Sequence, residues 1–304
     1  MVRRRIGAVL TAVLLGGLAG HPASAADEEK PPAPAVDLFD SGRLLATGGV
    51  SALEGAGGGG LAAWAIITGY GTAQAVGGNA HYTYVNLPSY TIRSPGAALG
   101  LFDRVEFSVA HIAFDTGSTG GKLGLGNGFT FNENVFGAKL RLIGDAIYDQ
   151  DSWLPQLAVG AQYKTNDQRA VLHAIGARDA SGVDFYFAAT KLFLAQSLLV
   201  SGALRETRAN QFGILGFGGD RNNAYMTQFE GSAALLLTRQ LALGGEFRTK
   251  PNNLRFAGEG AAGDVFLAYF FDKHVSSTLA FVDLSDIATQ RHQQGVYVSL
   301  QVGF

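Results

Sequence analysis

The sequence has no cysteine among its 304 residues, and only 16% of its residues are charged. The lack of cysteine excludes a disulfide-stapled scaffold and a zinc site built on cysteine ligands. A formal net charge of −2 leaves no basic excess, so we expect no nucleic-acid partner. Glycine and aromatic residues are plentiful instead, with 42 glycines and 11% aromatic residues.

The first 25 residues have the pattern of a cleaved secretory signal peptide. Arginines precede a short apolar run over residues 6–19, and a small-residue cleavage motif ends at Ala25. The alternative, a membrane-anchoring helix, is disfavoured because the run is shorter than the roughly 20 residues that a spanning helix needs. Residues 26–42 carry prolines among charges, which predicts an exposed periplasmic linker. No later stretch is apolar for long enough to span a membrane as a helix, so the exported chain is either soluble or a β-barrel.

The rest of the chain alternates apolar and polar side chains with a period of two, which predicts strands with two different faces. The end of the chain shows the pattern best, with Val298, Leu300, Val302 and Phe304 on one face. Counted back from the end, the pattern predicts strands near 295–304, 274–284, 264–271, 240–249, 225–236, 196–206, 182–191, 155–165, 136–143 and 104–114. Four further strands, 90–101, 77–86, 61–70 and 43–52, follow from it less regularly.

The connections between these strands alternate in length. Short turns at Asp103 and Asp272 join some neighbouring strands, and long polar segments join the other strand pairs. The long segments are 115–135, 166–181, 207–224, 250–263 and 285–294. Outer-membrane barrels join their strands by short periplasmic turns and long outer loops.

The sequence therefore predicts an all-β fold, a transmembrane antiparallel up-and-down β-barrel over residues 43–304. We expect about 14 strands, with 12 as the alternative if Gly55–Gly60 belongs to an irregular N-terminal segment. The predicted location is the outer membrane of a Gram-negative bacterium, with the long segments outside the cell.

The polar faces of the predicted strands carry charges of both signs. A membrane barrel turns its apolar face to lipid and its polar face inward, whereas a soluble barrel does the reverse. The lumen-facing candidates are Glu106, Lys139, Arg141, Gln162, Lys164, Arg205, Glu230, Glu246 and Arg248. These charges suit either an open aqueous pore or a packed interior that only stabilises the barrel, because pore width depends on strand number and tilt.

Several segments resemble known families. The terminal Phe304, with Val298, Leu300 and Val302 before it, resembles the assembly signal of Gram-negative outer-membrane barrels. LGLFDRVEFS is similar to the hairpins of exported barrels linked to aromatic-compound degradation. More closely, a series of segments resembles a Gram-negative outer-membrane barrel family catalogued as a domain of unknown function. These segments are GGLAAWAIITGYGT, LGLFDRVEFSVA, IYDQDSWLPQLAVG, VDFYFAATKLFLAQSLLVSGALR, ANQFGILGFGG and YVSLQVGF. The resemblance implies a barrel, with outer-membrane lipid and the barrel-assembly machinery as partners, and it supplies no functional residues.

Other motifs favour simpler interpretations. Gly55–Gly60 matches GxGxxG, but no acidic residue lies between Glu54 and Asp103, so we interpret it as a flexible turn and expect no cofactor. Asp145, Asp149 and Asp151 lack the order of a calcium loop and favour a turn, so we expect no metal site.

Three functions fit these patterns. We expect a channel or uptake pore for a small-molecule solute, with a closed structural barrel as the alternative. The third is an outer-membrane hydrolase that acts on lipid or envelope polymer. The chain has no GxSxG elbow, and His111 with Ser108 or Ser118 is the nearest catalytic grouping, so we expect no enzyme.

Overall fold

The structure is a computed structural model that describes residues 37–40 and 42–304. The predicted signal peptide, residues 1–25, lies outside the described residues, as does most of the predicted linker, 26–42. Among the described residues, no helix has the length and apolar character needed to cross a membrane.

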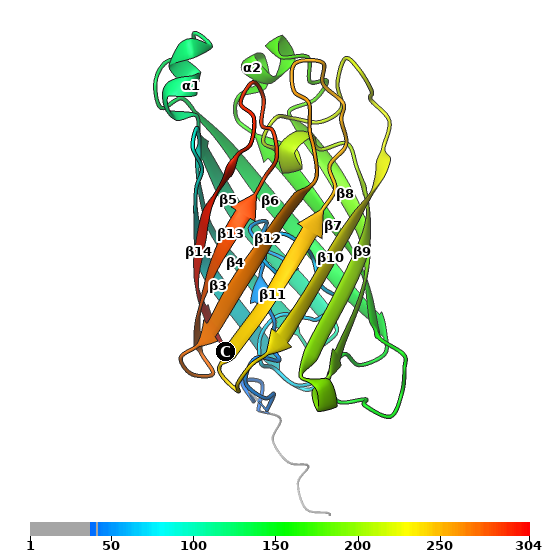
Figure 1. Ribbon diagram of the computed structural model, residues 1–304. Helices are drawn as coiled ribbons and strands as arrows, with labels where there is room; N and C mark the ends of the chain where they lie inside the picture. The colour runs from blue at the N-terminus through cyan, green and yellow to red at the C-terminus, as the bar shows by residue number, and fades with distance from the viewer. Residues whose placement is uncertain (1–36, 41) are drawn as a thin grey trace, which may run out of the picture. The chain divides into compact units, whose positions relative to one another are not determined.

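The described part of the chain forms one closed barrel of twelve antiparallel strands (Figure 1). Neighbours in the chain pair with one another, and the last strand closes the ring on the first. The strands are β3 (Val76–Asn86), β4 (Thr91–Leu101), β5 (Val105–Asp115), β6 (Thr130–Ile143), β7 (Gln156–Asn166), β8 (Ser181–Phe193), β9 (Leu198–Thr207), β10 (Met226–Leu236), β11 (Leu241–Arg248), β12 (Ala262–Phe270), β13 (Val275–Asp283) and β14 (Gln294–Gly303). The barrel fold is confirmed, and the alternative of twelve strands is right where the count of about 14 was wrong.

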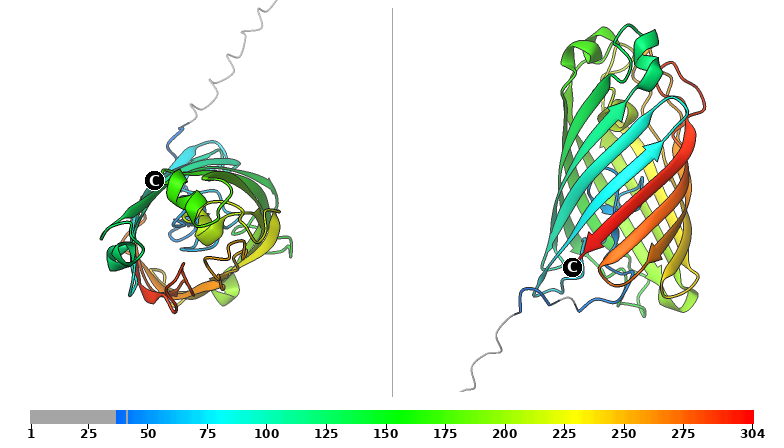
Figure 2. Two further views of the ribbon diagram at one scale, coloured as in Figure 1. Left: turned by 90° about the horizontal axis from the view of Figure 1, so that it is seen from above. Right: turned by 90° about the vertical axis from the view of Figure 1, so that its left-hand side faces the viewer.

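The two extra strands predicted at 43–52 and 61–70 do not join the barrel. Residues 42–75, here called the plug segment, run inside the ring instead (Figure 2, left). The plug segment contains only the short pair β1 (Val50–Ser51) and β2 (Gly57–Gly58), which bond to each other. A spanning strand alternates between lipid and lumen, whereas residues 61–67 are apolar at every position and buried at every position. That unbroken run suits a segment enclosed on all sides.

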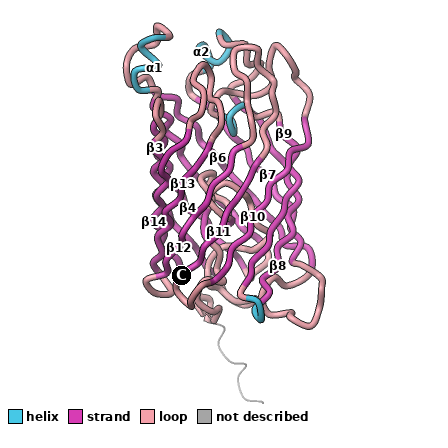
Figure 3. The backbone as a smooth tube through the Cα atoms, in the orientation of Figure 1, coloured by secondary structure: helices cyan, strands magenta, loops and turns pink. Residues whose placement is uncertain are grey.

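The connections differ at the two ends of the barrel (Figure 3). The long ones meet at one end, where α1 (Gly117–Lys122) and α2 (Arg169–Ala174) lie, and the C-terminus lies at the other. The short turns there include η1 (Leu194–Gln196). The β9–β10 connection departs from the predicted outer loop, because its helical turn η2 (Asn210–Gly213) is buried inside the barrel mouth.

The outer face of the barrel is apolar and the inner face carries the charges. Phe107, Phe136 and Leu300 are each about half exposed on the outside. Val298, Val302 and Phe304 are exposed on the same outer surface, and their role in assembly stays a prediction. An apolar exterior around a charged interior is the arrangement of a membrane barrel.

Candidate functional site: the plugged interior

Charged side chains of the wall hold the backbone of the plug segment. The Glu106 carboxylate accepts hydrogen bonds from the amides of Gly57 (2.8 Å) and Thr68 (2.9 Å). The Lys139 ammonium donates to the carbonyls of Gly57 (2.8 Å) and Ile66 (2.9 Å), and it pairs with Glu106 at 3.0 Å. Buried backbone groups need partners, and here side chains of β5 and β6 supply them in place of a neighbouring strand.

Two acids on the opposite wall hold the next stretch of the plug segment. Glu230 accepts from the amide of Ala63 (2.9 Å), and Glu246 accepts from the amide of Leu61 (2.6 Å). The chain passes so close to Glu246 that a Cβ added at Gly59 would lie 1.5 Å from its Oε1. Glycine is therefore required at Gly59 by a close approach.

Glu54, the acid of the plug segment, lies at the centre of a buried ionic network. Its carboxylate pairs with Arg248 (2.7 Å) and with Lys164. Lys164 also pairs with Asp184 (2.7 Å), and Arg248 with Glu230 (3.2 Å). All these side chains are buried, and removing one partner from such a pair costs about 3–5 kcal/mol.

Lys164 and Arg248 also contact the β9–β10 loop. Lys164 donates to the carbonyl of Phe212 (2.8 Å), and the Arg248 guanidinium lies 4.4 Å from the centre of the Phe212 ring. Gln211 and Phe212 have positive φ angles of 45° and 65°, a conformation that side chains disfavour. The plug segment and η2 therefore meet on Lys164 and Arg248 in the middle of the barrel.

Two further charged side chains, Glu259 and Lys250, hold η2 in place. The Gln211 amide donates to both oxygens of Glu259 (2.9 and 2.8 Å), and Lys250 donates to the Gln211 side chain (2.7 Å). Both titratable groups belong to the β11–β12 loop. Burial raises the pKa of Glu259 to about 7 and lowers the pKa of Lys250 to about 8.

The remaining predicted lumen residues fall in two places. Arg205 donates to Gln162 (2.6 Å) and lies with it among the buried central side chains. Arg141 lies apart, at the short-turn end of the barrel, where it pairs with Asp103 and with Asp145 (3.0 Å). The structure thus gathers eight of the nine candidates around the plug segment and places Arg141 at the rim.

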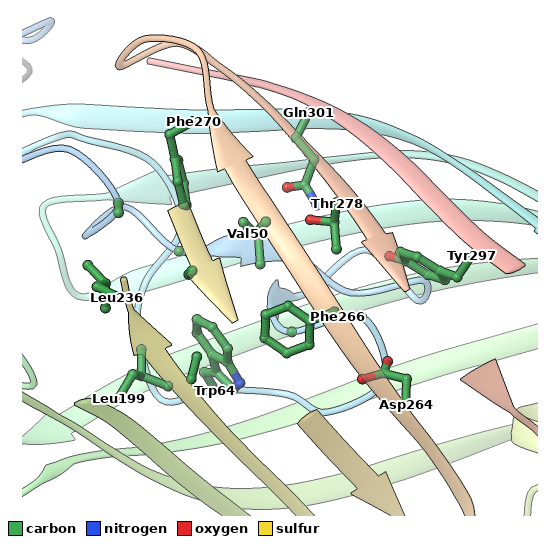
Figure 4. Close-up of a pocket in the computed structure, with 17 residues that line it drawn as sticks. Val50, Trp64, Leu199, Leu236, Asp264, Phe266, Phe270, Thr278, Tyr297 and Gln301 are labelled. Atoms are coloured by element: carbon green, nitrogen blue, oxygen red, sulfur yellow. The ribbon is translucent and has the colours of Figure 1, made fainter. Parts of the chain in front are cut away.

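The sequence prediction missed an apolar half of the interior. The inner faces of β9 to β14 and the plug segment enclose a cavity lined by Trp64, Leu199, Phe266 and Phe270 (Figure 4). It measures about 50 Å³, which is room for a few water molecules. The available signal was β12, whose side chains are apolar on both faces.

The weaker motifs are not brought together as sites. Ser108 is buried and faces inward, whereas His111 is exposed and bonds Asn134 (2.8 Å), so the two lie on opposite faces of β5. Asp145 accepts the amide of Ile147 (2.8 Å), which fits a turn. No cluster of metal-ligating residues occurs within residues 37–40 and 42–304.

Comparisons with known proteins identify a family without a described function. No curated protein matches the chain. Among solved structures, it is similar to the KdgM porin (10% identity, TM-score 0.47, covering 74% of this chain and 99% of that one). It is also similar to the COG4313 outer membrane channel from Pseudomonas putida F1 (11%, TM-score 0.46, covering 75% and 95%). A third is outer membrane phospholipase A from Escherichia coli (11%, TM-score 0.39, covering 75% and 92%). The model described as "Protein of unknown function (DUF3034)" matches residues 47–301, from within the plug segment to the last strand, so the chain belongs to the DUF3034 family.

Proposed function

We propose that the protein is an integral outer-membrane β-barrel that acts as a gated channel or uptake pore for small molecules. The observation that carries this proposal is that the plug segment is not part of the barrel ladder. Hydrogen bonds between backbone groups of residues 43–69 stay within the plug segment, and the first such bond to the wall joins the Tyr70 amide to the Phe304 carbonyl (2.8 Å). The plug segment can therefore leave without breaking any strand pairing.

The width of the barrel supports a lumen that needs a separate closure. Eight strands enclose an interior that side chains alone can fill, and the space grows with strand number. Here twelve strands surround an additional segment of about 30 residues. The apolar exterior supports a location in the outer membrane, where lipid and the barrel-assembly machinery would be the partners.

A permanently closed structural barrel is the second candidate, and the network at Glu54 favours it. Opening would separate Glu54 from Lys164 and Arg248, at a cost of several kcal/mol unless water enters at once. We do not propose a hydrolase, because Ser108 and His111 face opposite ways.

A reversible disulfide between the plug segment and the wall tests whether the protein is a channel or a structural barrel. Ser51 Oγ lies 2.7 Å from Asn79 Oδ1 of β3, and the chain has no cysteine of its own. Ser51→Cys with Asn79→Cys, bridged by oxidation or a short bifunctional thiol reagent, should abolish ionic current across planar bilayers, and reduction should restore it. Each single variant serves as the control. If the reduced double variant passes no current at either polarity, the barrel is structural.

A further inference from the structure

The wall binds the backbone of the plug segment at every second residue from Leu61 to Ala65. The Leu61 and Ala63 amides donate to carboxylates of β11 and β10 at 2.6 and 2.9 Å, and the Ala65 amide donates to a hydroxyl of β8 at 2.8 Å. The Leu61 and Ala65 carbonyls accept from side chains of β11 and β7 at 3.3 and 2.6 Å. The wall residues in this set are Glu246, Glu230, Thr190, Arg248 and Gln156. Contacts at alternate residues are typical of sites that bind a peptide through its backbone.

Backbone groups between these residues have partners inside the plug segment. The Trp64 amide donates to the Gly57 carbonyl (3.2 Å), and the Ala62 carbonyl accepts from the Gly59 amide (2.9 Å). The amides of Ala63 and Trp64 therefore differ, because the first is bound by the wall and the second by the plug segment itself.

The wall beside this stretch is lined by small apolar side chains. Ala63 and Ala65 belong to one buried cluster with side chains of β7, β8 and β9, which are Ala158, Tyr186, Ala188 and Ala203. Methyl groups suit such a surface, whereas the hydroxyl groups of a sugar would lose their hydrogen bonds to water there without gaining others.

Two acids without a cation lie where this stretch begins. Glu246 and Asp264 are directly opposite each other in the register of β11 and β12, and Asp264 lines the interior beside Gly59 and Gly60 (Figure 4). Both acids are buried, and neither forms a salt bridge with a described residue. Buried charges are normally paired. The plug segment brings only glycines to this point, so a ligand with an ammonium group would supply the missing charge.

We propose that the lumen binds short peptides of small apolar residues with a free amino end, which compete with the plug segment for these wall groups. The first residue takes the place of Leu61, so that its ammonium group faces Glu246 and Asp264. The third and fifth amides bond Glu230 and Thr190, as Ala63 and Ala65 do in the closed barrel. The inference rests on the proposed channel, for which it names a class of solute, but binding itself requires no transport.

The two tryptophans of the chain make the test direct. Trp64 is 6% exposed in the plug segment, and Trp153 is 88% exposed at the short-turn end. In the full chain with Trp153→Phe, the fluorescence excited at long wavelength therefore comes from Trp64 alone. Titration in detergent with pentaalanine amide, which has a free amino end, should shift this emission to the red in a saturable way, because the peptide displaces the plug segment.

Changes in the probe identify the contacts. N-acetylation removes the ammonium group and should weaken binding at least about tenfold. N-methylation of the third amide, the counterpart of Ala63, should weaken it about tenfold. N-methylation of the fourth amide, the counterpart of Trp64, is the matched control and should have little effect. Glucosamine has an ammonium group without apolar side chains and should bind at least about tenfold more weakly than the peptide.

Variants of the protein locate the site. Asp264 makes no hydrogen bond to the plug segment, so Asp264→Asn should weaken binding of the free amino end about fivefold and leave the acetylated peptide unchanged. Glu54→Gln, which should loosen the plug segment, should raise the affinity for pentaalanine amide at least about tenfold. Asp151→Asn, at an exposed position, should leave it unchanged. Heat-modifiable migration on gels verifies that each variant is folded.

Several outcomes would overturn the proposal. They are the absence of a saturable red shift with pentaalanine amide, equal affinity for the acetylated peptide or for glucosamine, and equal affinity for the two N-methylated peptides. Peptide binding without ionic current in bilayers would remove the channel and keep the site. Current without peptide binding would keep the channel and remove the site.

Discussion

The barrel wall and the plug segment satisfy their buried backbones in two different ways. The wall pairs its amides and carbonyls strand to strand around a closed ring. The plug segment depends on side chains of the wall, such as Glu106 and Lys139, for several of its backbone partners. We therefore expect the wall to fold without the plug segment. The plug segment, in contrast, should have no stable structure without the wall.

The largest effect should come from Lys164, where the wall, the plug segment and η2 meet. Lys164→Gln leaves Glu54 and Asp184 buried without their shared cation, which should lower the free energy of unfolding by about 3–5 kcal/mol. Arg141→Gln is the matched change at the rim and should cost less, because Asp103 keeps its ion pair with Arg43. Urea titrations read by heat-modifiable migration measure both. Equal costs would mean that the interior is solvated.

Glu54 tests whether the plug segment can be released by itself. In Glu54→Gln, Lys164 keeps Asp184 and Arg248 keeps Glu230, so the wall should stay intact while the plug segment loosens. A reporter cysteine at Ala63, which is buried, should then react with maleimide at least about tenfold faster, equivalent to 1.4 kcal/mol.

The control for this release is the exposed carboxylate of Asp151 in the β6–β7 connection. Asp151→Asn should leave the labelling rate at Ala63→Cys as in the parent. Loss of the folded barrel in Glu54→Gln would show that the plug segment and the wall are one cooperative unit.

A smaller effect is expected from a single methyl group between the plug segment and the wall. Gly59→Ala places a Cβ against the Glu246 carboxylate and should cost about 1–3 kcal/mol by overpacking. A Cβ at Gly258, in the β11–β12 loop, meets nothing within 4 Å, so Gly258→Ala should be neutral. Thermal scans compare the two, and equal stability would contradict the close packing at Gly59.

The last effect is a pH dependence of the β9–β10 loop. Burial raises the pKa of Glu259 to about 7 from an ordinary value of 4.5, so the closed loop binds the proton more tightly than the open one. The contribution of Glu259 to closure is therefore present below pH 4.5 and declines as the pH rises to about 7. Hydrogen exchange of residues 209–218, corrected for intrinsic rates, should show this decline. Glu259→Gln should flatten it, and an unchanged profile in the variant would assign it elsewhere.

The wall was predictable because the membrane imposes a local rule on its sequence. Alternation between lipid and lumen placed the predicted strands 77–86 and 182–191 close to β3 and β8. The same rule identified inward charges such as Glu106 and Lys139, which are directly opposite each other in the register of β5 and β6.

The interior was not predictable, because its order comes from contacts far apart in the chain. Residues 61–70 have the composition of a buried strand, and only the surrounding ring decides that they are enclosed. Glu54 carries no local sign that it meets Lys164, 110 positions away, and Arg248, 194 positions away. Phe212 lies in a polar segment whose expected place was outside.

The claim that the plug segment closes the channel is tested most directly by deleting residues 43–69. This deletion removes the plug segment up to the Tyr70 contact with Phe304. The measurement is the ionic current of the refolded variant in planar bilayers, beside the full chain. The account predicts a heat-modifiable barrel with sustained current, where the full chain shows only brief openings. A deletion variant that does not form a barrel, or one that forms a barrel and passes no current, would contradict it.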